Sequence, residues 1–322
     1  MNTIIPNTKL LGISRRHFLS TTGAAAAAAC LAPRQLLGKE ASPVDIIREA
    51  AATAEITVTK LRGNVSVLEG SGGNIAVLTG RDGKLLVEAG ITASRKRITE
   101  ALASLGPEPV KHLINSHWHF DHTDGNEWLH SEGAEIIAHE NTRKRLSVDT
   151  RVEMWDFNFP ASPAGALPTK VFANEHELHL NGTAIKLKYY PPAHTDSDIS
   201  VEFTNADILH VADTWWNGYY PFIDYSTGGS IDGSIRAAEA NVARVTSKTI
   251  IIPGHGPVGD KKQLSEFRDM LVTIREKVAA LKKKGRSLDE IIAAKPTEPF
   301  DAKWGGFVIK PPAFVSLVYA GV

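Results

Sequence analysis

The chain has 322 residues and a hydrophobic fraction of 43%, which is enough for one sizeable core. Its 36 basic residues balance 36 acidic residues and form no basic patch, so the composition argues against a nucleic acid-binding protein. The only cysteine, Cys30, precedes the predicted domain, which therefore contains neither a disulfide nor a thiolate metal ligand.

Residues 1–38 are predicted to be an export signal. The pair Arg15-Arg16 precedes an apolar, alanine-rich run that is too short to span a membrane. This order resembles twin-arginine signals, which implies export to the periplasm by the twin-arginine machinery. Cys30 allows a lipoprotein alternative, which we disfavour because Ala27 stands where a leucine is usual three positions before the cysteine.

Alternation with a period of two predicts an antiparallel start to the folded domain, with a hairpin turn signal at Arg81-Asp82-Gly83. A helix and a buried strand then lead to a cluster of histidines. The expected elements are a linker with a short helix at 39–55, strands at 56–61, 65–68, 74–78 and 84–87, a helix at 94–105 and a strand at 110–115.

An aromatic, proline-rich stretch interrupts the regular pattern at 149–170. It comes after helices at 126–131 and 141–147 that flank a strand at 135–138. A loop of this length inside a compact domain is predicted to be a lid or a binding loop. The alternative is a surface loop whose own side chains pack together.

The second half repeats the order of strands followed by helices. The expected elements are strands at 177–180, 184–190, 199–203 and 207–211, a helix at 232–245, a strand at 249–252, and helices at 263–281 and 287–294. We expect residues 56–300 to form one domain, and residues 301–322 to be an irregular tail that packs on the domain or trails from it.

The stretch from His117 to His122 is the densest group of potential metal ligands in the chain. His117 and His119 are two residues apart in extended backbone and point the same way, so they can share one ion. Asp121 and His122 continue into a turn, where they can face a second ion. Imidazole and carboxylate groups without a thiolate suit zinc, iron or manganese.

Three further ligand-type residues follow apolar strands in the second half, namely His194, Asp213 and His255. If these strands share a sheet, their ends converge and bring the three side chains to the cluster. The other histidines of the domain lack this relation to a strand and are predicted to be structural or on the surface: His112, His130, His139, His176, His179 and His210.

Together these motifs resemble the metallo-β-lactamase superfamily over roughly residues 56–285. The matching features are the H-x-H-x-D-H motif, the later histidine, the aspartate and the Gly-His pair. The resemblance implies an α/β fold, a four-layer αββα sandwich with metals at one edge. It also implies a binuclear site in which the first metal takes His117, His119 and His194, the second takes Asp121, His122 and His255, and Asp213 bridges them.

The ligand set and the resemblance predict an exported binuclear zinc hydrolase. Three protein nitrogens on an ion leave a position for water, and two ions lower the pKa of a shared water towards neutrality. We expect the resulting metal-bound hydroxide, oriented by Asp121, to attack the carbonyl of a small-molecule lactam, lactone, ester or thioester. Two zinc ions per chain are expected, with iron or manganese as alternatives.

Other activities on the same scaffold stay open. A bridging Asp213 and the lack of a cysteine ligand are more typical of glyoxalase II-like thioesterases and lactonases than of β-lactamases, whereas export favours a β-lactamase. A mononuclear iron enzyme like the persulfide dioxygenases would use His117, His194 and Asp213. A non-catalytic binding protein would keep the metal site alone. The sequence indicates neither the substrate nor the oligomeric state.

A second aromatic stretch, at 214–225, follows Asp213 directly and is predicted to line the substrate pocket. The alternative is that it packs against the stretch at 149–170. Within it, Tyr219 or Tyr220 is a candidate catalytic donor of a hydrogen bond to a developing oxyanion.

Overall fold

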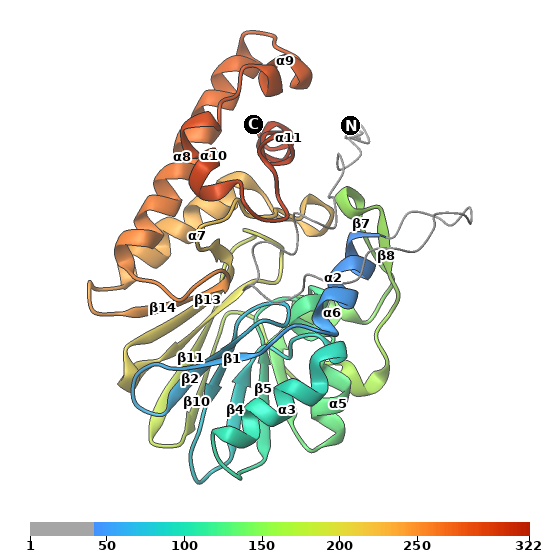
Figure 1. Ribbon diagram of the computed structural model, residues 1–322, viewed down its shortest axis with the longest axis vertical. Helices are drawn as coiled ribbons and strands as arrows, with labels where there is room; N and C mark the ends of the chain where they lie inside the picture. The colour runs from blue at the N-terminus through green and yellow to red at the C-terminus, as the bar shows by residue number, and fades with distance from the viewer. Residues whose placement is uncertain (1–41) are drawn as a thin grey trace.

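The computed structural model describes residues 42–322, so the predicted signal at 1–38 lies outside the described residues. Two β-sheets face each other, and helices cover the outer face of each (Figure 1). The predicted four-layer αββα sandwich is therefore confirmed. Within 42–322, no helix combines the length and the apolar character that crossing a membrane would require.

The first sheet has seven strands in the order β1-β2-β3-β4-β5-β6-β9. An antiparallel meander, β1 to β4, is followed by parallel pairing through β5, β6 and β9. The strands are β1 Thr57–Lys60, β2 Val65–Glu69, β3 Ile75–Leu78, β4 Lys84–Val87, β5 Val110–Asn115, β6 Glu135–His139 and β9 Lys170–Phe172.

The second sheet has five strands in the order β10-β11-β12-β13-β14. Its first pairings are antiparallel, and β13 and β14 run parallel, so β11, β13 and β14 all end at the same edge. The strands are β10 Glu175–Leu180, β11 Thr183–Tyr189, β12 Ile199–Phe203, β13 Ile208–Trp216 and β14 Ile250–His255.

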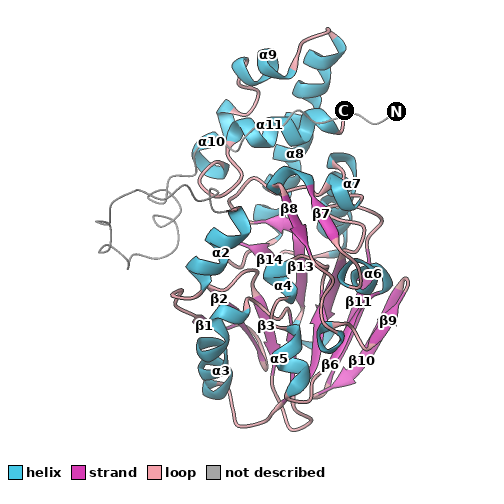
Figure 2. Cartoon of the chain, turned by 90° about the vertical axis from the view of Figure 1, so that its right-hand side faces the viewer, coloured by secondary structure: helices cyan, strands magenta, loops and turns pink. Residues whose placement is uncertain are grey.

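Helices α3 and α5 lie against the first sheet, and α7 and α8 lie against the second (Figure 1). Figure 2 shows α9, α10 and α11 gathered with α8 at one end of the molecule. The helices are α2 Pro43–Ala51, α3 Arg95–Ser104, α4 Phe120–Thr123, α5 Asn126–Ser131, α6 Glu140–Leu146, α7 Ile231–Arg244, α8 Lys261–Lys283, α9 Leu288–Ala293, α10 Glu298–Trp304 and α11 Pro311–Ala320.

Side chains on neighbouring positions of the strands point into different layers of the core, as the period of two requires. In β4, Leu85 packs between the two sheets while Leu86 packs against the helices outside the first sheet. In β14, Ile252 packs between the sheets and Ile251 packs with α8. Strands β3 and β4 are buried on both faces, whereas β11 exposes Lys186 and Lys188 on one face. A strand with at least one buried face has little freedom to slip in register.

The expectation of an irregular tail at 301–322 is wrong, because this segment forms the end of α10 and the whole of α11. The Pro311-Pro312 pair marks the first turn of α11, a position that favours proline. The helix buries Phe314 and Val318 in the same core cluster as α8. A short, almost wholly apolar helix shows little amphipathic periodicity, which is why the pattern did not reveal it.

The aromatic stretch at 149–170 is more regular than expected. It contains a small hairpin of β7, Thr150–Val152, and β8, Phe157–Phe159, joined by a short 3₁₀ turn at Glu153–Trp155. Strands of three residues are too short to show a period of two, so sequence reasoning missed them.

Two other local expectations also change. Strand β13 continues past the predicted end at residue 211 to Trp216, and Asp213 therefore lies inside a strand. Asp121 and His122 lie in the short helix α4 and not in a simple turn.

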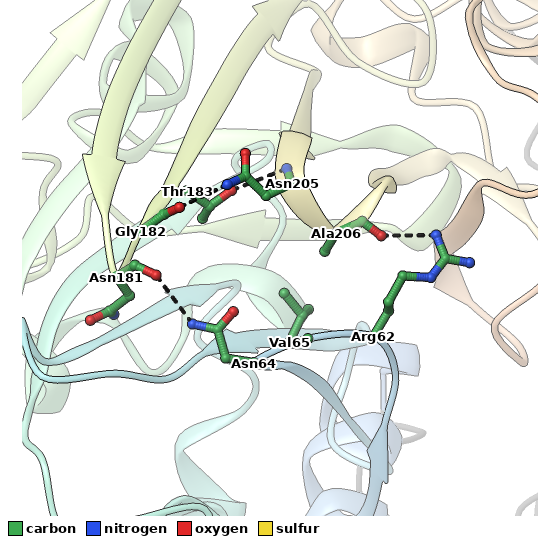
Figure 3. A pocket seen from close by; sticks show the side chains of 9 residues that line it. Arg62, Asn64, Val65, Asn181, Gly182, Thr183, Asn205 and Ala206 are labelled. Carbon is green, nitrogen blue, oxygen red and sulfur yellow. Dashed lines mark hydrogen bonds between the residues drawn. The ribbon is translucent and has the colours of Figure 1, made fainter.

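A small cavity of about 120 Å³ lies at the edge of the sandwich where β13 begins (Figure 3). Arg62 lines it and donates to the main-chain carbonyls of Ala206 and Lys248, which ties the β1–β2 turn to the second sheet. The cavity therefore belongs to the joint between the sheets, at the opposite end of β13 from the predicted ligands.

Replacing Phe314 with alanine should lower the free energy of unfolding by about 3–5 kcal/mol. The side chain is 0% exposed, and its ring stacks on Tyr220 at 4.6 Å between centroids. Urea denaturation followed by tryptophan fluorescence measures the change. The control Ala320→Ser, at an exposed position of α11, should shift it by less than about 0.5 kcal/mol. Equally small losses for both variants would mean that α11 is not part of the cooperative unit.

Candidate metal centre

The seven predicted ligands all meet at the edge of the sandwich where β5, β13 and β14 end. The segment after β5 supplies the first histidines, α4 supplies two ligands, and the β11–β12 loop, β13 and β14 supply one each. They fall into two groups, one of His117, His119, His194 and Asp213 and the other of Asp121, His122 and His255.

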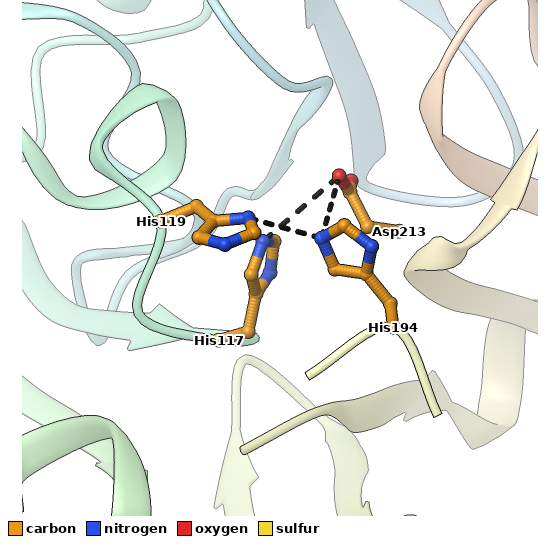
Figure 4. A group of neighbouring side chains, drawn as sticks. All are labelled: His117, His119, His194 and Asp213. Carbon is orange, nitrogen blue, oxygen red and sulfur yellow. Dashed lines mark hydrogen bonds and ion pairs between the residues drawn. The ribbon is translucent and has the colours of Figure 1, made fainter. Parts of the chain in front are cut away.

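Figure 4 shows the first group, in which three imidazoles and one carboxylate converge on a common point. His194 Nε2 lies 3.0 Å from His119 Nδ1 and 3.4 Å from Asp213 Oδ2. All three imidazole rings are 2% exposed or less. Three nitrogens and one oxygen at these distances form a donor set that suits a first-row transition metal.

The second group adjoins the first and contains the most accessible carboxylate of the centre. Asp121 Oδ2 lies 3.3 Å from His255 Nε2 and 3.5 Å from His122 Nε2. The Asp121 side chain is 12% exposed, whereas that of Asp213 is 3% exposed. The second group is therefore the side of the centre that solvent reaches more readily.

The carboxylate of Asp213 connects the two groups. Its Oδ1 lies 3.2 Å from His122 Nε2, and its Oδ2 lies 3.5 Å from His255 Nε2 as well as close to His194. Both oxygens of Asp213 thus face nitrogens of the second group, and Oδ2 also faces a nitrogen of the first group. A carboxylate in this position fits the role of a ligand shared by two ions.

The hydrogen-bonding state of the buried atoms fits a metal. His117 Nε2, His122 Nε2 and Asp213 Oδ1 are buried and make no well-aligned hydrogen bond within the described residues. Unsatisfied buried polar groups are costly and rare in native proteins, so several at one point indicate a missing ion. The residues present therefore fit the metals that the family pattern implies.

Electrostatics separate the histidines of the two groups. Burial lowers the pKa of His194 to about 4, and burial together with the neighbouring His122 lowers the pKa of His117 well below its usual range. Burial also opposes the charge on His255, but Asp213 and Asp121 outweigh it and raise the pKa of His255 to about 9. Metal binding by His255 would therefore compete with protons.

Close backbone approach explains the glycine before His255. A Cβ atom on Gly254 would lie 1.9 Å from Asp213 Oδ1, so a side chain there would displace the bridging carboxylate. Ala212 precedes this carboxylate with a φ of 46°, in the left-handed region, where the register between β13 and β14 shifts. The backbone is therefore irregular at the centre, and unusual backbone conformations of this kind are common at functional sites.

Sequence reasoning missed the groups that hold the ligands in place. Asp224 Oδ2 accepts from His119 Nε2 at 3.0 Å, which leaves Nδ1 of that ring for the centre. Ser116 Oγ lies 2.9 Å from His117 Nδ1, and the carbonyl of Phe222 lies 2.8 Å from His194 Nδ1. Such partners fix the orientation of a ligand ring and raise its basicity.

Glu88 is a further buried carboxylate beside the centre. Its side chain is fully buried, with Oε1 3.6 Å from His122 Nδ1 and Oε2 accepting from the main-chain amide of Ser116 at 3.3 Å. Neither Glu88 nor Asp224 carries a local motif, so no sequence signal could have identified them.

The two candidate tyrosines have different surroundings in the structure. The Tyr220 hydroxyl is buried and donates to Asp301 Oδ1 at 2.9 Å, and its ring stacks on α11, so the hypothesis that it serves the centre is wrong. Tyr219 is half-buried beside Gly256, which follows His255, and stays a candidate.

Most of the aromatic stretch at 214–225 is core, and it packs against the stretch at 149–170 as the alternative interpretation expected, with Phe222 stacked on Trp155. Trp215 is 0% exposed and Trp216 is 4% exposed. His210, which was expected to be structural, is buried with Nε2 3.0 Å from the carbonyl of Asn74 and belongs to neither ligand group.

The family model described as the metallo-beta-lactamase superfamily matches residues 68–260, more than half of the chain. The chain belongs to the metallo-beta-lactamase superfamily. A model of the twin-arginine translocation pathway signal sequence matches residues 12–32, in agreement with the predicted export signal.

A curated relative from Nocardioides sp. (strain JS1661) is named 2,4-dinitroanisole O-demethylase subunit alpha. It is 29% identical over 128 residues, which are 39% of this chain and 35% of the relative. The match thus spans about a third of that protein's length.

Two solved metallo-beta-lactamases and a solved sec-alkylsulfatase share the fold at low identity. The enzyme from Pontibacter korlensis is 18% identical with a TM-score of 0.54, over 67% of this chain and 99% of its own. The DIM-1 metallo-beta-lactamase is 21% identical with a TM-score of 0.54, over 68% of this chain and 98% of its own. The sec-alkylsulfatase Pisa1 from Pseudomonas sp. is 15% identical with a TM-score of 0.60, over 85% of this chain and 52% of its own.

Replacing Asp224 with asparagine should weaken zinc affinity by roughly 10–100-fold, because His119 loses the anionic partner of its Nε2 proton. Competition with a chromogenic chelator measures the affinity, and the number of ions bound at saturation should stay unchanged. The matched control Asp149→Asn lies at an exposed position away from the ligands and should have no effect. Unchanged affinity in Asp224→Asn would show that this contact does not support the ligand.

Proposed function

We propose that this protein is an exported, metal-dependent hydrolase of the periplasm that holds two zinc ions and acts on a carbonyl substrate. The observation that carries the proposal is the position of Asp213, whose two oxygens face ligand nitrogens of both groups. A site for one ion would not require this shared carboxylate. The match to a twin-arginine signal supports export.

The chemistry of the centre follows from its donor set. Zinc ions held by the two ligand groups would supply a hydroxide near neutral pH and would offset the negative charge that develops on the substrate. In hydrolysis, water adds its oxygen to the carbonyl carbon, the bond to the leaving oxygen, nitrogen or sulfur breaks, and the leaving group departs with a proton. The products are a carboxylic acid and an alcohol, amine or thiol.

Asp121 is the residue of the centre that orients the nucleophile. Its carboxylate is more exposed than that of Asp213 and lies against His122 and His255. The burial of Asp121 favours a neutral carboxyl group, but the adjacent His122 and His255 lower its pKa below the usual value. An ionised carboxylate here accepts a hydrogen bond from a water molecule and directs its lone pair at the substrate.

A second candidate function is cleavage of an alkyl aryl ether, in which water releases an alcohol and a phenol. It is favoured by the curated relative named as an O-demethylase of 2,4-dinitroanisole. The substrates 2,4-dinitrophenyl acetate and 2,4-dinitroanisole release the same coloured phenolate, so they compare carbonyl attack with ether cleavage directly. Faster turnover of the ether would favour the second function.

Zinc-loaded protein should contain about two zinc ions per chain and hydrolyse at least one member of a panel of lactam, lactone, thioester and aryl ester substrates. Dialysis against a chelator should abolish the activity, and added zinc should restore it. Metal analysis of protein purified without added metal checks the content. One iron per chain would support the mononuclear oxygenase alternative and contradict the proposal.

The variant Asp121→Ala should reduce kcat by at least about 100-fold while one zinc ion stays bound, because the first ligand group is intact. Steady-state kinetics and metal analysis on the same sample separate the two effects. The control Asp289→Ala, at an exposed position of α9, should leave both unchanged. Loss of all metal from Asp121→Ala would contradict the role given to this residue.

A further inference from the structure

We propose that the metal centre takes a substrate with a planar aromatic group, which stacks on Trp155 beside the first ligand group or on Phe307 beside the second. The inference rests on the proposed function and names the substrate class for the same site. Neither residue belongs to a strand that carries ligands, and Phe307 lies in the segment expected to be a tail.

Trp155 brings the β7–β8 hairpin to the first ligand group. Its ring centroid lies 5.8 Å from that of His119, and the ring stacks on Phe222 at 4.9 Å with an interplanar angle of 27°. Phe222 is buried and supplies the carbonyl that fixes His194, whereas Trp155 is only partly buried. The hairpin therefore places an indole ring, stacked on Phe222, next to a ligand of the centre.

Phe307 has the same relation to the second ligand group. It lies between α10 and α11, with its centroid 6.1 Å from His255, 5.9 Å from Trp216 and 4.6 Å from Tyr219. Trp216 is buried, while Phe307 and Tyr219 are partly exposed. The C-terminal helices thus place a second aromatic surface beside the more accessible side of the centre.

The surfaces that Trp155 and Phe307 form beside the centre are aromatic. Partly exposed rings fixed by buried neighbours lose little conformational freedom on binding. Such rings recognise a planar aromatic group by offset or edge-to-face packing.

A pair of zinc-binding hydroxamates tests the proposal without requiring turnover. Benzohydroxamate and acetohydroxamate share the chelating group and differ in the phenyl ring. Zinc-loaded full-length protein should bind benzohydroxamate at least about tenfold more tightly, by isothermal titration calorimetry. Equal affinities for the two compounds, or binding of neither, would overturn the proposal.

Variants locate the stacking surface. Phe307→Leu or Trp155→Leu should reduce the preference for benzohydroxamate by roughly threefold to tenfold and leave the affinity for acetohydroxamate unchanged. The matched controls are Phe300→Leu in α10 and Phe157→Leu in the hairpin, which keep the same chemistry away from the ligands. Loss of affinity for both hydroxamates in equal proportion, or no change in either variant, would contradict the assignment.

The two proposals fail in different ways. If wild-type protein hydrolyses none of the carbonyl substrates but still prefers benzohydroxamate, the proposed reaction is wrong and the aromatic site stands. If it hydrolyses them with no preference between the hydroxamates, the reaction stands and the aromatic site is wrong.

Discussion

The centre depends on the placement of one buried carboxylate, that of Asp213, against imidazoles from both ligand groups. Its oxygens lie 3.2 Å from His122 and 3.4 Å from His194, and its side chain is almost wholly excluded from water. Burial alone would favour its protonated form, but His122 and His255 hold its pKa well below the usual range. A buried anion needs cationic partners, and His122 and His255 are the neighbouring groups that can supply positive charge.

The position of the Asp213 carboxylate also depends on the backbone around it. The carboxylate can occupy its position because Gly254 leaves room for it and because Ala212 adopts a left-handed conformation inside β13. Asn74 ties the first sheet to the same place, donating to the carbonyls of Pro253 and Gly256. The two sheets are thus joined at the edge where their ligands meet, so the sandwich and the centre stabilise each other.

The candidate centre and the segments around it come from different parts of the fold. The ligands lie at the ends of buried strands, and partners such as Asp224 lock their rings. Trp155 comes from a small hairpin and Phe307 from a connection between C-terminal helices, segments that can change without disturbing the sheets. Such an arrangement lets the surfaces around a buried site differ while the site itself is kept.

The sequence by itself determined the fold class, the strand that leads to His117, and the seven residues that meet at the candidate centre, because buried strands and ligand-type residues directly after them leave a local pattern. It also predicted most helices and strands to within a few residues. Only the tertiary structure decided that α11 is part of the core, that Tyr220 faces away from the centre and that Asp224, Trp155 and Phe307 adjoin it. His119 and Asp224 are 105 residues apart, and contacts over such distances leave no periodic trace in the chain. The local sequence therefore predicts the ligand-type residues. The surfaces around them form only when segments that are distant in the sequence pack together.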